Sequence, residues 1–119
     1  MAPAQSFRPH EHLRRPADFK RVYARKRSVS DSFLIVYACE NGLGYNRLGL
    51  SVSRKVGSAV IRNRIRRLFR EAYRLSKTDL PGGMDLVLIP RQGAEIELSK
   101  LLEALPRLVR QVSKRLSKQ

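Results

Sequence analysis

The sequence predicts a single α+β domain in which three helices pack on a mostly antiparallel four-stranded sheet. Apolar residues recur every three or four positions in three segments, and they alternate or run together in several short β-branched segments. The chain has 119 residues, a length that suits one domain, and 42% of them are hydrophobic, enough for one modest core. The expected order of elements is helix, three strands, helix, strand, helix.

The N-terminal part is interpreted as a flexible arm, residues 1–12, followed by the domain, residues 13–119. Pro16 suits the first position of a helix. Apolar residues then recur at the spacing of one helical face: Phe19, Val22 and Tyr23. The basic run 25–27 is typical of a helix C-terminus, so we expect a short helix with an aromatic face.

Three short segments after this helix have the character of β-strands. The run 33–39 is rich in β-branched and aromatic side chains, and in 48–52 apolar residues alternate with Gly and Ser. The loop between them contains Asn41-Gly42, so we expect these two strands to pair as a hairpin. A further short edge strand is predicted at 28–30.

From Ser58, a candidate N-cap, the hydrophobic period changes to that of a helix. Its apolar residues fall within an arc of about 120° that is expected to face the core: Ile61, Ile65, Leu68, Phe69, Ala72 and Leu75. A Pro-Gly-Gly break at 81–83 precedes a strand at 85–90. The last element is an amphipathic helix over 101–116, which Pro106 is expected to kink or to split in its first turn.

The charge balance predicts a polyanionic partner. The chain has 25 Lys and Arg against 10 Asp and Glu, a formal net charge of +15. Nucleic acid is therefore the first candidate partner, followed by an anionic membrane surface and an acidic protein. The longest apolar run, 33–39, is far shorter than the roughly 20 residues of a membrane-spanning helix, and the first nine residues lack the apolar stretch of a secretory signal. Because Cys39 is the one cysteine, it forms no internal disulfide and is expected to be a small core residue. We expect a cytoplasmic protein.

The segment after Ser58 is the most informative, because its cations occupy the arc that the apolar residues leave free. Its arginines are Arg62, Arg64, Arg66, Arg67, Arg70 and Arg74. Glu71 is the one acid among them, and like charges four positions apart cost a few tenths of a kcal/mol per pair. A surface that served only solubility would mix signs, so a phosphate-binding face is favoured over a solvated one. Arg54 and Lys55 precede the helix and extend this basic patch.

Aromatic residues lie among cations in the first helix. Phe19 and Tyr23 are one turn apart and are flanked by Lys and Arg. This arrangement suits single-stranded nucleic acid, because a base stacks on a ring while a cation meets its phosphate. The alternative is ordinary core packing, which the residues alone favour. Tyr37 presents the same two alternatives on a strand face that it shares with Phe33 and Ile35.

The sequence contains no evident catalytic set. There is no spaced carboxylate pair, no His near a candidate nucleophile, and no Gly-rich loop of the phosphate-binding type. His10, Glu11 and His12 are too few to form a metal site and precede any rigid element. We therefore expect neither a catalytic residue nor a metal ligand in this chain.

The chain resembles the protein subunit of bacterial ribonuclease P. The resemblance rests on the Arg62-Asn63-Arg64 signature within 59–71, on the segment 48–57 before it, and on Asp18-Phe19 with Tyr23. It extends from about Phe7 to the final helix. It implies a fold like domain 2 of ribosomal protein S5, with a left-handed strand–helix–strand crossover around the arginine-rich helix, opposite to the usual hand.

This resemblance also implies a role in removing the 5′ leader from precursor tRNA. Catalysis would belong to a large RNA subunit that uses Mg²⁺, and the protein would bind that RNA and the single-stranded leader in a heteromeric ribonucleoprotein. Matching positions imply that these residues bind the RNA subunit: Arg54, Lys55, Arg62, Asn63, Arg64, Arg66, Arg67 and Arg70. The leader would contact Phe19, Tyr23 and Tyr37, where Tyr23 replaces a common Phe and keeps a stacking ring. A ribosomal or other structural RNA-binding protein is the alternative, and a duplex-DNA binder is disfavoured because no helix-turn-helix spacing is present.

Overall fold

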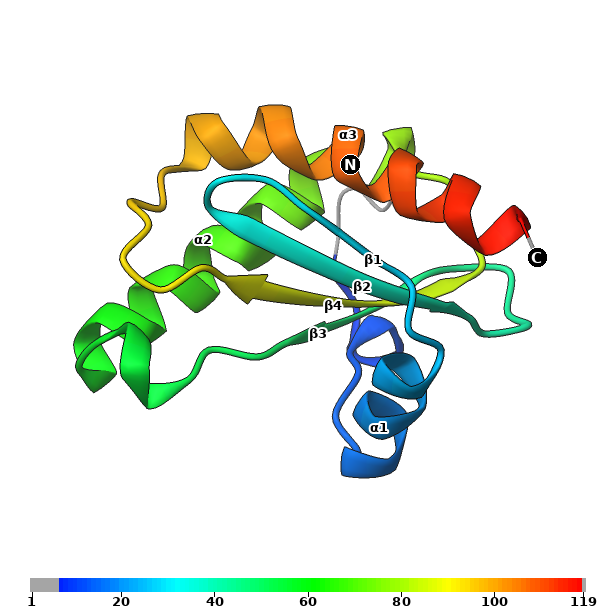
Figure 1. Ribbon diagram of the computed structural model, residues 1–119, viewed down its shortest axis with the longest axis horizontal. Helices are drawn as coiled ribbons and strands as arrows, with labels where there is room; N and C mark the ends of the chain where they lie inside the picture. The colour runs from blue at the N-terminus through cyan, green and yellow to red at the C-terminus, as the bar shows by residue number, and fades with distance from the viewer. Residues whose placement is uncertain (1–6, 119) are drawn as a thin grey trace.

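A four-stranded sheet forms the middle layer of the protein (Figure 1). The computed structural model describes residues 7–118 and places the strands in the order β1-β2-β4-β3. The strands are β1 (Ser28–Ser30), β2 (Leu34–Glu40), β3 (Arg47–Leu50) and β4 (Met84–Pro90). β1 pairs with β2 and β2 with β4 in antiparallel fashion, whereas β3 and β4 are parallel. The sheet is thus mostly antiparallel, as predicted, with one parallel pair, and the short edge strand at 28–30 is confirmed.

The predicted hairpin between 33–39 and 48–52 is wrong. β2 pairs along its whole length with β4, and β3 lies on the other side of β4, with Gly49 opposite Val87. The physical reason is the burial of β4, in which every residue from Met84 to Leu88 is buried. A strand this apolar is most stable in the middle of a sheet that is covered on both faces. Turn residues after a strand therefore did not determine which strand becomes its partner.

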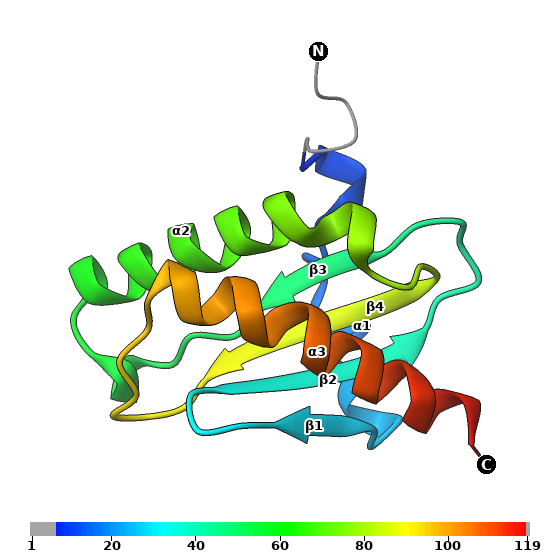
Figure 2. The same cartoon turned by 90° about the horizontal axis from the view of Figure 1, so that it is seen from above.

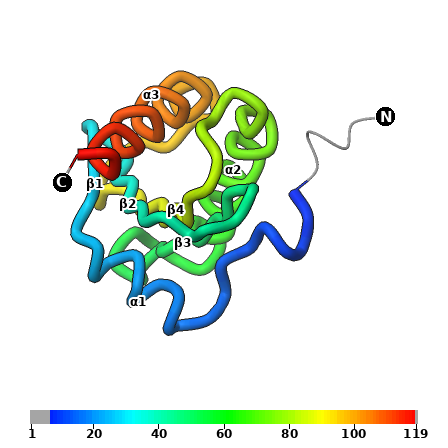
Figure 3. The backbone as a smooth tube through the Cα atoms, turned by 90° about the vertical axis from the view of Figure 1, so that its right-hand side faces the viewer, coloured from blue at the N-terminus to red at the C-terminus, as the bar shows by residue number. Residues whose placement is uncertain are grey.

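Helices cover both faces of the sheet. They are α1 (Pro16–Ala24), α2 (Ala59–Ser76) and α3 (Leu98–Ser117). α2 and α3 lie side by side on one face and α1 lies on the other (Figures 1 and 3). The main core lies under α2 and α3, and its largest fully buried side chains include Tyr73 and Phe69. A smaller cluster lies under α1 and contains Leu13, Val22 and Val87 together with Cys39, which is a buried core residue as predicted.

The connection from β3 through α2 to β4 is a left-handed crossover. The two strands are parallel neighbours, and α2 returns the chain over one face of the sheet. In Figure 2 the helices face the viewer, and when the strands are turned to point upward β4 lies to the left of β3. This is the hand that the resemblance implies and the opposite of the common one.

Two local expectations about the helices have different outcomes. Ser58 caps α2 as predicted, because its hydroxyl accepts a hydrogen bond from the N–H of Ile61 at 3.3 Å. α3 continues through Pro106 without interruption, so the predicted split does not occur. Proline removes one N–H, which would have bonded to the carbonyl of Leu102, and that residue lies on the solvent-exposed side of the helix.

Residues 7–12, the described part of the predicted arm, pack against α2. Pro9–Glu11 form a short 3-10 helix. The ring of Phe7 stacks on His12 with 3.8 Å between ring centroids, and it lies 5.2 Å from the ring of Tyr73. The buried carboxylate of Glu11 accepts a hydrogen bond from Nζ of Lys77 at 2.6 Å. These contacts attach the segment to the fold, and residues 1–6 of the arm lie outside the described part of the chain.

Candidate nucleic-acid interface

α2 carries most of its arginines on the side that faces away from the core. Arg64, Arg67 and Arg70 are exposed, and Arg62, Arg66 and Arg74 are half-buried. Arg74 is paired with Glu71 at 2.7 Å. For the other five, no carboxylate of residues 7–118 lies within 4 Å of a guanidinium nitrogen. We call these five residues, Arg62, Arg64, Arg66, Arg67 and Arg70, the arginine face.

Local hydrogen bonds hold part of the arginine face in position. Nε of Arg62 donates to the carbonyl of Gly57 at 3.3 Å, and Nη1 of Arg66 donates to Oδ1 of Asn63 at 2.9 Å. A guanidinium has five N–H donors, so each bond orients the side chain and leaves donors for a phosphate. Arg54 and Lys55 are exposed in the short 3-10 helix Arg54–Val56, two residues before α2, so all eight predicted RNA-subunit contacts lie within the continuous segment 54–70.

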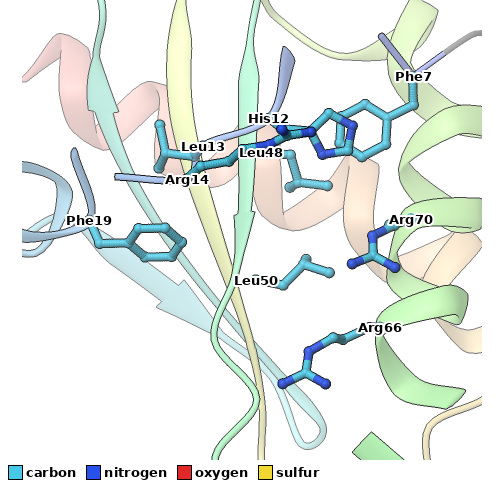
Figure 4. A pocket seen from close by; sticks show the side chains of 9 residues that line it. All are labelled: Phe7, His12, Leu13, Arg14, Phe19, Leu48, Leu50, Arg66 and Arg70. Atoms are coloured by element: carbon cyan, nitrogen blue, oxygen red, sulfur yellow. The ribbon is translucent and has the colours of Figure 1, made fainter. Parts of the chain in front are cut away.

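A hollow of about 380 Å³ lies between the arginine face and α1 (Figure 4). Arg66 and Arg70 reach into it from α2, Leu50 of β3 lies on its floor, and Phe19 and Arg14 approach from the opposite side. The structure therefore places Phe19, for which the resemblance implies leader binding, across one hollow from two arginines for which it implies binding of the RNA subunit.

The electrostatics of this hollow favour an anion. His12, from the segment before α1, is one of the residues that line this hollow. Burial lowers the pKa of His12 below its ordinary value, and the positive charges of Arg14 and Arg70 lower it further. Burial disfavours charge of either sign, whereas the positive charges of Arg14 and Arg70 attract an anion.

The predicted aromatic residues meet where α1 packs on the sheet. The rings of Tyr23 and Tyr37 are perpendicular, with 5.1 Å between centroids, and both are half-buried against the smaller core cluster. Phe19 rests on Gly49, where an added Cβ would lie 2.6 Å from Cζ of the ring. We call Phe19, Tyr23 and Tyr37 the aromatic face: the rings pack on the protein and also keep accessible surface. Phe33, expected on the same face as Tyr37, instead packs with the main core.

A buried carboxylate that the sequence analysis missed anchors α1 to the sheet. Asp85 is fully buried at the start of β4 and accepts hydrogen bonds from Nε and Nη2 of Arg47 at 2.8 and 2.7 Å and from Nδ2 of Asn41 at 3.0 Å. Arg21 of α1 donates to the same carboxylate and, at 2.8 Å, to Sγ of Cys39. Burial alone would raise the pKa of Asp85, but the hydrogen bonds from Arg47, Asn41 and Arg21 hold it below its ordinary value. The one available signal was an acid within an apolar strand.

Among residues 7–118, no helix is both long and apolar enough to cross a membrane. Over the same range, no group of three or more His, Cys, Asp or Glu side chains is placed to hold a metal ion.

The fold and the uncompensated arginine face define the class as a small basic RNA-binding protein. Residues 7–113 match the family Ribonuclease P. The chain is 40% identical over 107 residues to the ribonuclease P protein component of Lachnoclostridium phytofermentans, which covers 87% of this chain and 92% of that relative. It also resembles the solved RNase P protein of Thermotoga maritima, with a TM-score of 0.78, 33% identity, and coverage of 85% of this chain and 96% of that one. For the Staphylococcus aureus RNase P protein the TM-score is 0.74 at 33% identity, over 84% and 93% of the two chains.

The chain belongs to the family of ribonuclease P protein components. It is thus the protein subunit of ribonuclease P, a ribonucleoprotein. This enzyme is an endoribonuclease that processes tRNA, and its RNA performs the catalysis. This membership decides against the alternative of a ribosomal or other structural RNA-binding protein.

Proposed function

We propose that the arginine face, with Arg54, Lys55 and Asn63, binds the catalytic RNA, and that the aromatic face binds the single-stranded 5′ leader of precursor tRNA. The observation that carries this proposal is the hollow in which Phe19 faces Arg66 and Arg70. This hollow joins the two surfaces, so the same side of the protein contacts both the catalytic RNA and the leader that this RNA removes. The leader is thereby bound beside the enzyme's RNA.

The arginine face suits a large structured RNA. Its five guanidinium groups lie along one helix without a carboxylate partner among the described residues, and each fork binds phosphate oxygens in pairs. Phosphate contacts give affinity without requiring a particular base. This is the kind of contact expected of a subunit that stays assembled with its RNA.

The aromatic face suits an unpaired strand. A ring stacks only on a base that has left its own stack, and a single-stranded leader offers such bases whereas mature tRNA does not. Stacking is tolerant of base identity, so one surface serves leaders of many sequences. The aromatic face therefore distinguishes precursor from product by strandedness.

In this proposal the Mg²⁺ used in leader removal is held by the RNA subunit, whose phosphate oxygens are suitable ligands for a hard cation. The protein contributes cations and rings, which position RNA, and none of its side chains is assigned a bond-breaking role. We further propose that it acts in the cytoplasm.

The arginine face is tested by the salt dependence of assembly with the catalytic RNA. Replacing Arg62, Arg64 and Arg67 together by Gln should weaken binding and reduce the slope of log affinity against log salt by about 2 to 3. A matched control removes the same charge from α3, by Gln at Lys100, Arg110 and Lys114, and should leave the slope nearly unchanged. An unchanged slope in the first variant, or an equal change in both, would overturn the assignment.

The aromatic face is tested by two substrate affinities of the assembled enzyme. Tyr23→Ala should weaken binding of precursor tRNA by about 1–3 kcal/mol, the value of one stacked base, and leave binding of leaderless tRNA unchanged. Tyr23→Phe keeps the ring and should bind precursor normally, as should the control Tyr45→Ala, whose ring lies outside the aromatic face. Equal losses for both substrates would show that Tyr23 acts in assembly or folding, and the leader assignment would fail.

A further inference from the structure

A second cluster of cations lies at the C-terminal end of α3, beside the β1 edge of the sheet. Its members line a hollow of about 410 Å³, which we call the basic hollow: Lys26, Arg27, Arg115 and Lys118. The first two belong to the link between α1 and β1, and the other two to the end of α3. In the described range 7–118, no carboxylate lies within 4 Å of any of the four. The β1 edge is opposite the β3 edge, so the basic hollow is separate from the arginine face.

The fold holds these cations together. Nη1 of Arg115 donates to the carbonyl of Ser28 at 3.1 Å, which fixes the end of α3 over β1. Lys26 has a φ of 58°, in the left-handed region that residues other than Gly rarely adopt, and this turn carries the chain from α1 into the sheet. Cations stabilise the C-terminus of a helix, which accounts for some positive charge at each helix end. It does not account for two helix ends that direct four like charges into one hollow.

The order of the strands places the basic hollow next to the aromatic face. Phe19 rests on Gly49 of β3, and Tyr23 meets Tyr37 of β2, one strand beyond the central β4. The next strand is β1, and the N–H of Ala38 donates to the carbonyl of Arg27 at 3.1 Å. Figure 3 shows the link between α1 and β1 rising past this edge of the sheet toward the end of α3. A strand that crosses the aromatic face from β3 to β2 thus leaves the sheet beside the basic hollow.

We propose that the basic hollow binds backbone phosphates of leader nucleotides that extend beyond the aromatic face. The ligand class is single-stranded RNA, read by its charge and without selection of bases. The inference rests on the proposal that the leader lies on the aromatic face, and it adds a second, more distant contact. It predicts that affinity for precursor tRNA rises again when a leader becomes long enough to reach the β1 edge.

The experiment measures affinities of the assembled enzyme for precursor tRNAs whose leaders are lengthened one nucleotide at a time. The variant combines Lys26→Asn, which tolerates a positive φ, with Arg27→Gln and Lys118→Gln. It should lose about tenfold in affinity for long leaders at low salt, with a salt slope reduced by about 2 for this single strand, and bind short-leader and leaderless tRNA normally. The control carries Gln at Lys100, Arg110 and Lys114, which removes the same charge from α3 outside the basic hollow.

Three outcomes would overturn the inference: unchanged long-leader affinity, equal losses for all leader lengths, or weaker assembly with the catalytic RNA, which would assign the basic hollow to that RNA. Lys118→Gln alone, at the exposed end of α3, gives a second test that does not disturb the fold, and should reduce the slope by about 0.7. Failure of the underlying proposal is recognised separately, because Tyr23→Ala would then leave short-leader affinity unchanged.

Discussion

Removal of the Asp85 carboxylate should destabilise the protein more than removal of any exposed acid. Asp85→Ala deletes the acceptor shared by Arg21, Arg47 and Asn41, and these bonds attach α1 and the loop before β3 to the central strand. The two arginines would then face each other across a fully buried position, and the acid left beside both is Asp18, whose Oδ1 lies 3.7 Å from Nη2 of Arg21 and 3.9 Å from Nη2 of Arg47. Both the stability of the fold and the placement of the aromatic face depend on this carboxylate.

The expected loss is about 3 kcal/mol of unfolding free energy. Removing one partner of a buried ion pair costs about 3–5 kcal/mol, because the remaining charge is left without compensation. The side chains of Arg21 and Arg47 are 43% and 21% exposed, so after the substitution both regain some contact with water. This places the loss at the lower end of the range. For a chain of 119 residues it corresponds to a fall of roughly 10 °C in melting temperature.

Urea unfolding of the free protein measures this loss. Glu40→Ala is the matched control: it removes an acid that pairs with Arg25 at 3.1 Å but is 56% exposed, and its midpoint should stay at the wild-type value. Because folding lowers the pKa of Asp85, its carboxylate stabilises the fold above the ordinary pKa of 3.8, and this contribution is lost as the pH falls from there through the lower folded-state value. A loss below about 1 kcal/mol for Asp85→Ala, or an equal loss in the control, would refute the reasoning.

Three further outcomes are expected. Gly49→Val places new atoms where even a Cβ lies 2.6 Å from Cζ of Phe19, so it should destabilise the fold by about 1–3 kcal/mol. It should also weaken binding of precursor tRNA more than binding of leaderless tRNA, which paired affinity measurements will show. NMR titration should place the pKa of His12 below 6.5 in the free protein, and this pKa should rise when RNA phosphates bind near Arg70. An unchanged pKa on RNA binding would contradict the presence of an anion in that hollow. Asp18→Ala in a saturated complex should leave the cleavage step nearly intact, and a loss of about 10³-fold would reveal a catalytic role.

Local periodicity predicted the elements of this fold, whereas it did not predict their pairing. Each helix and strand was expected within a few residues of its observed bounds, because its pattern lies within the element itself. Strand partners depend on which segment is buried on both faces. That segment is β4, which is distant in sequence from β2 and β3 and takes the position between them because it is buried almost throughout. The Asn41-Gly42 turn was compatible with a hairpin but did not enforce one. The crossover hand was available from the family resemblance alone, since general rules give the opposite.

The same distinction separates the parts of the interface that the sequence predicted from those it did not. The arginine face belongs to one helix, so its residues and their shared direction follow from helical spacing. Asp85 and its partners come from α1, from the loop before β3 and from two strands, and the basic hollow joins the link after α1 to the end of α3. Nothing in the local sequence places such residues together, because their proximity depends on the packing of the whole sheet.

The aromatic face shows why its two alternative interpretations could not be separated from the sequence. Tyr23 and Tyr37 pack against the smaller core cluster and are only half-buried, so a core role leaves accessible surface on the same residues for the proposed stacking. α1 is held against the sheet by the Asp85 cluster, with Arg21 only two residues from Tyr23. Rings fixed in this way lose little conformational freedom when a base stacks on them, which favours binding. The core role of these residues therefore supports their proposed role in leader binding.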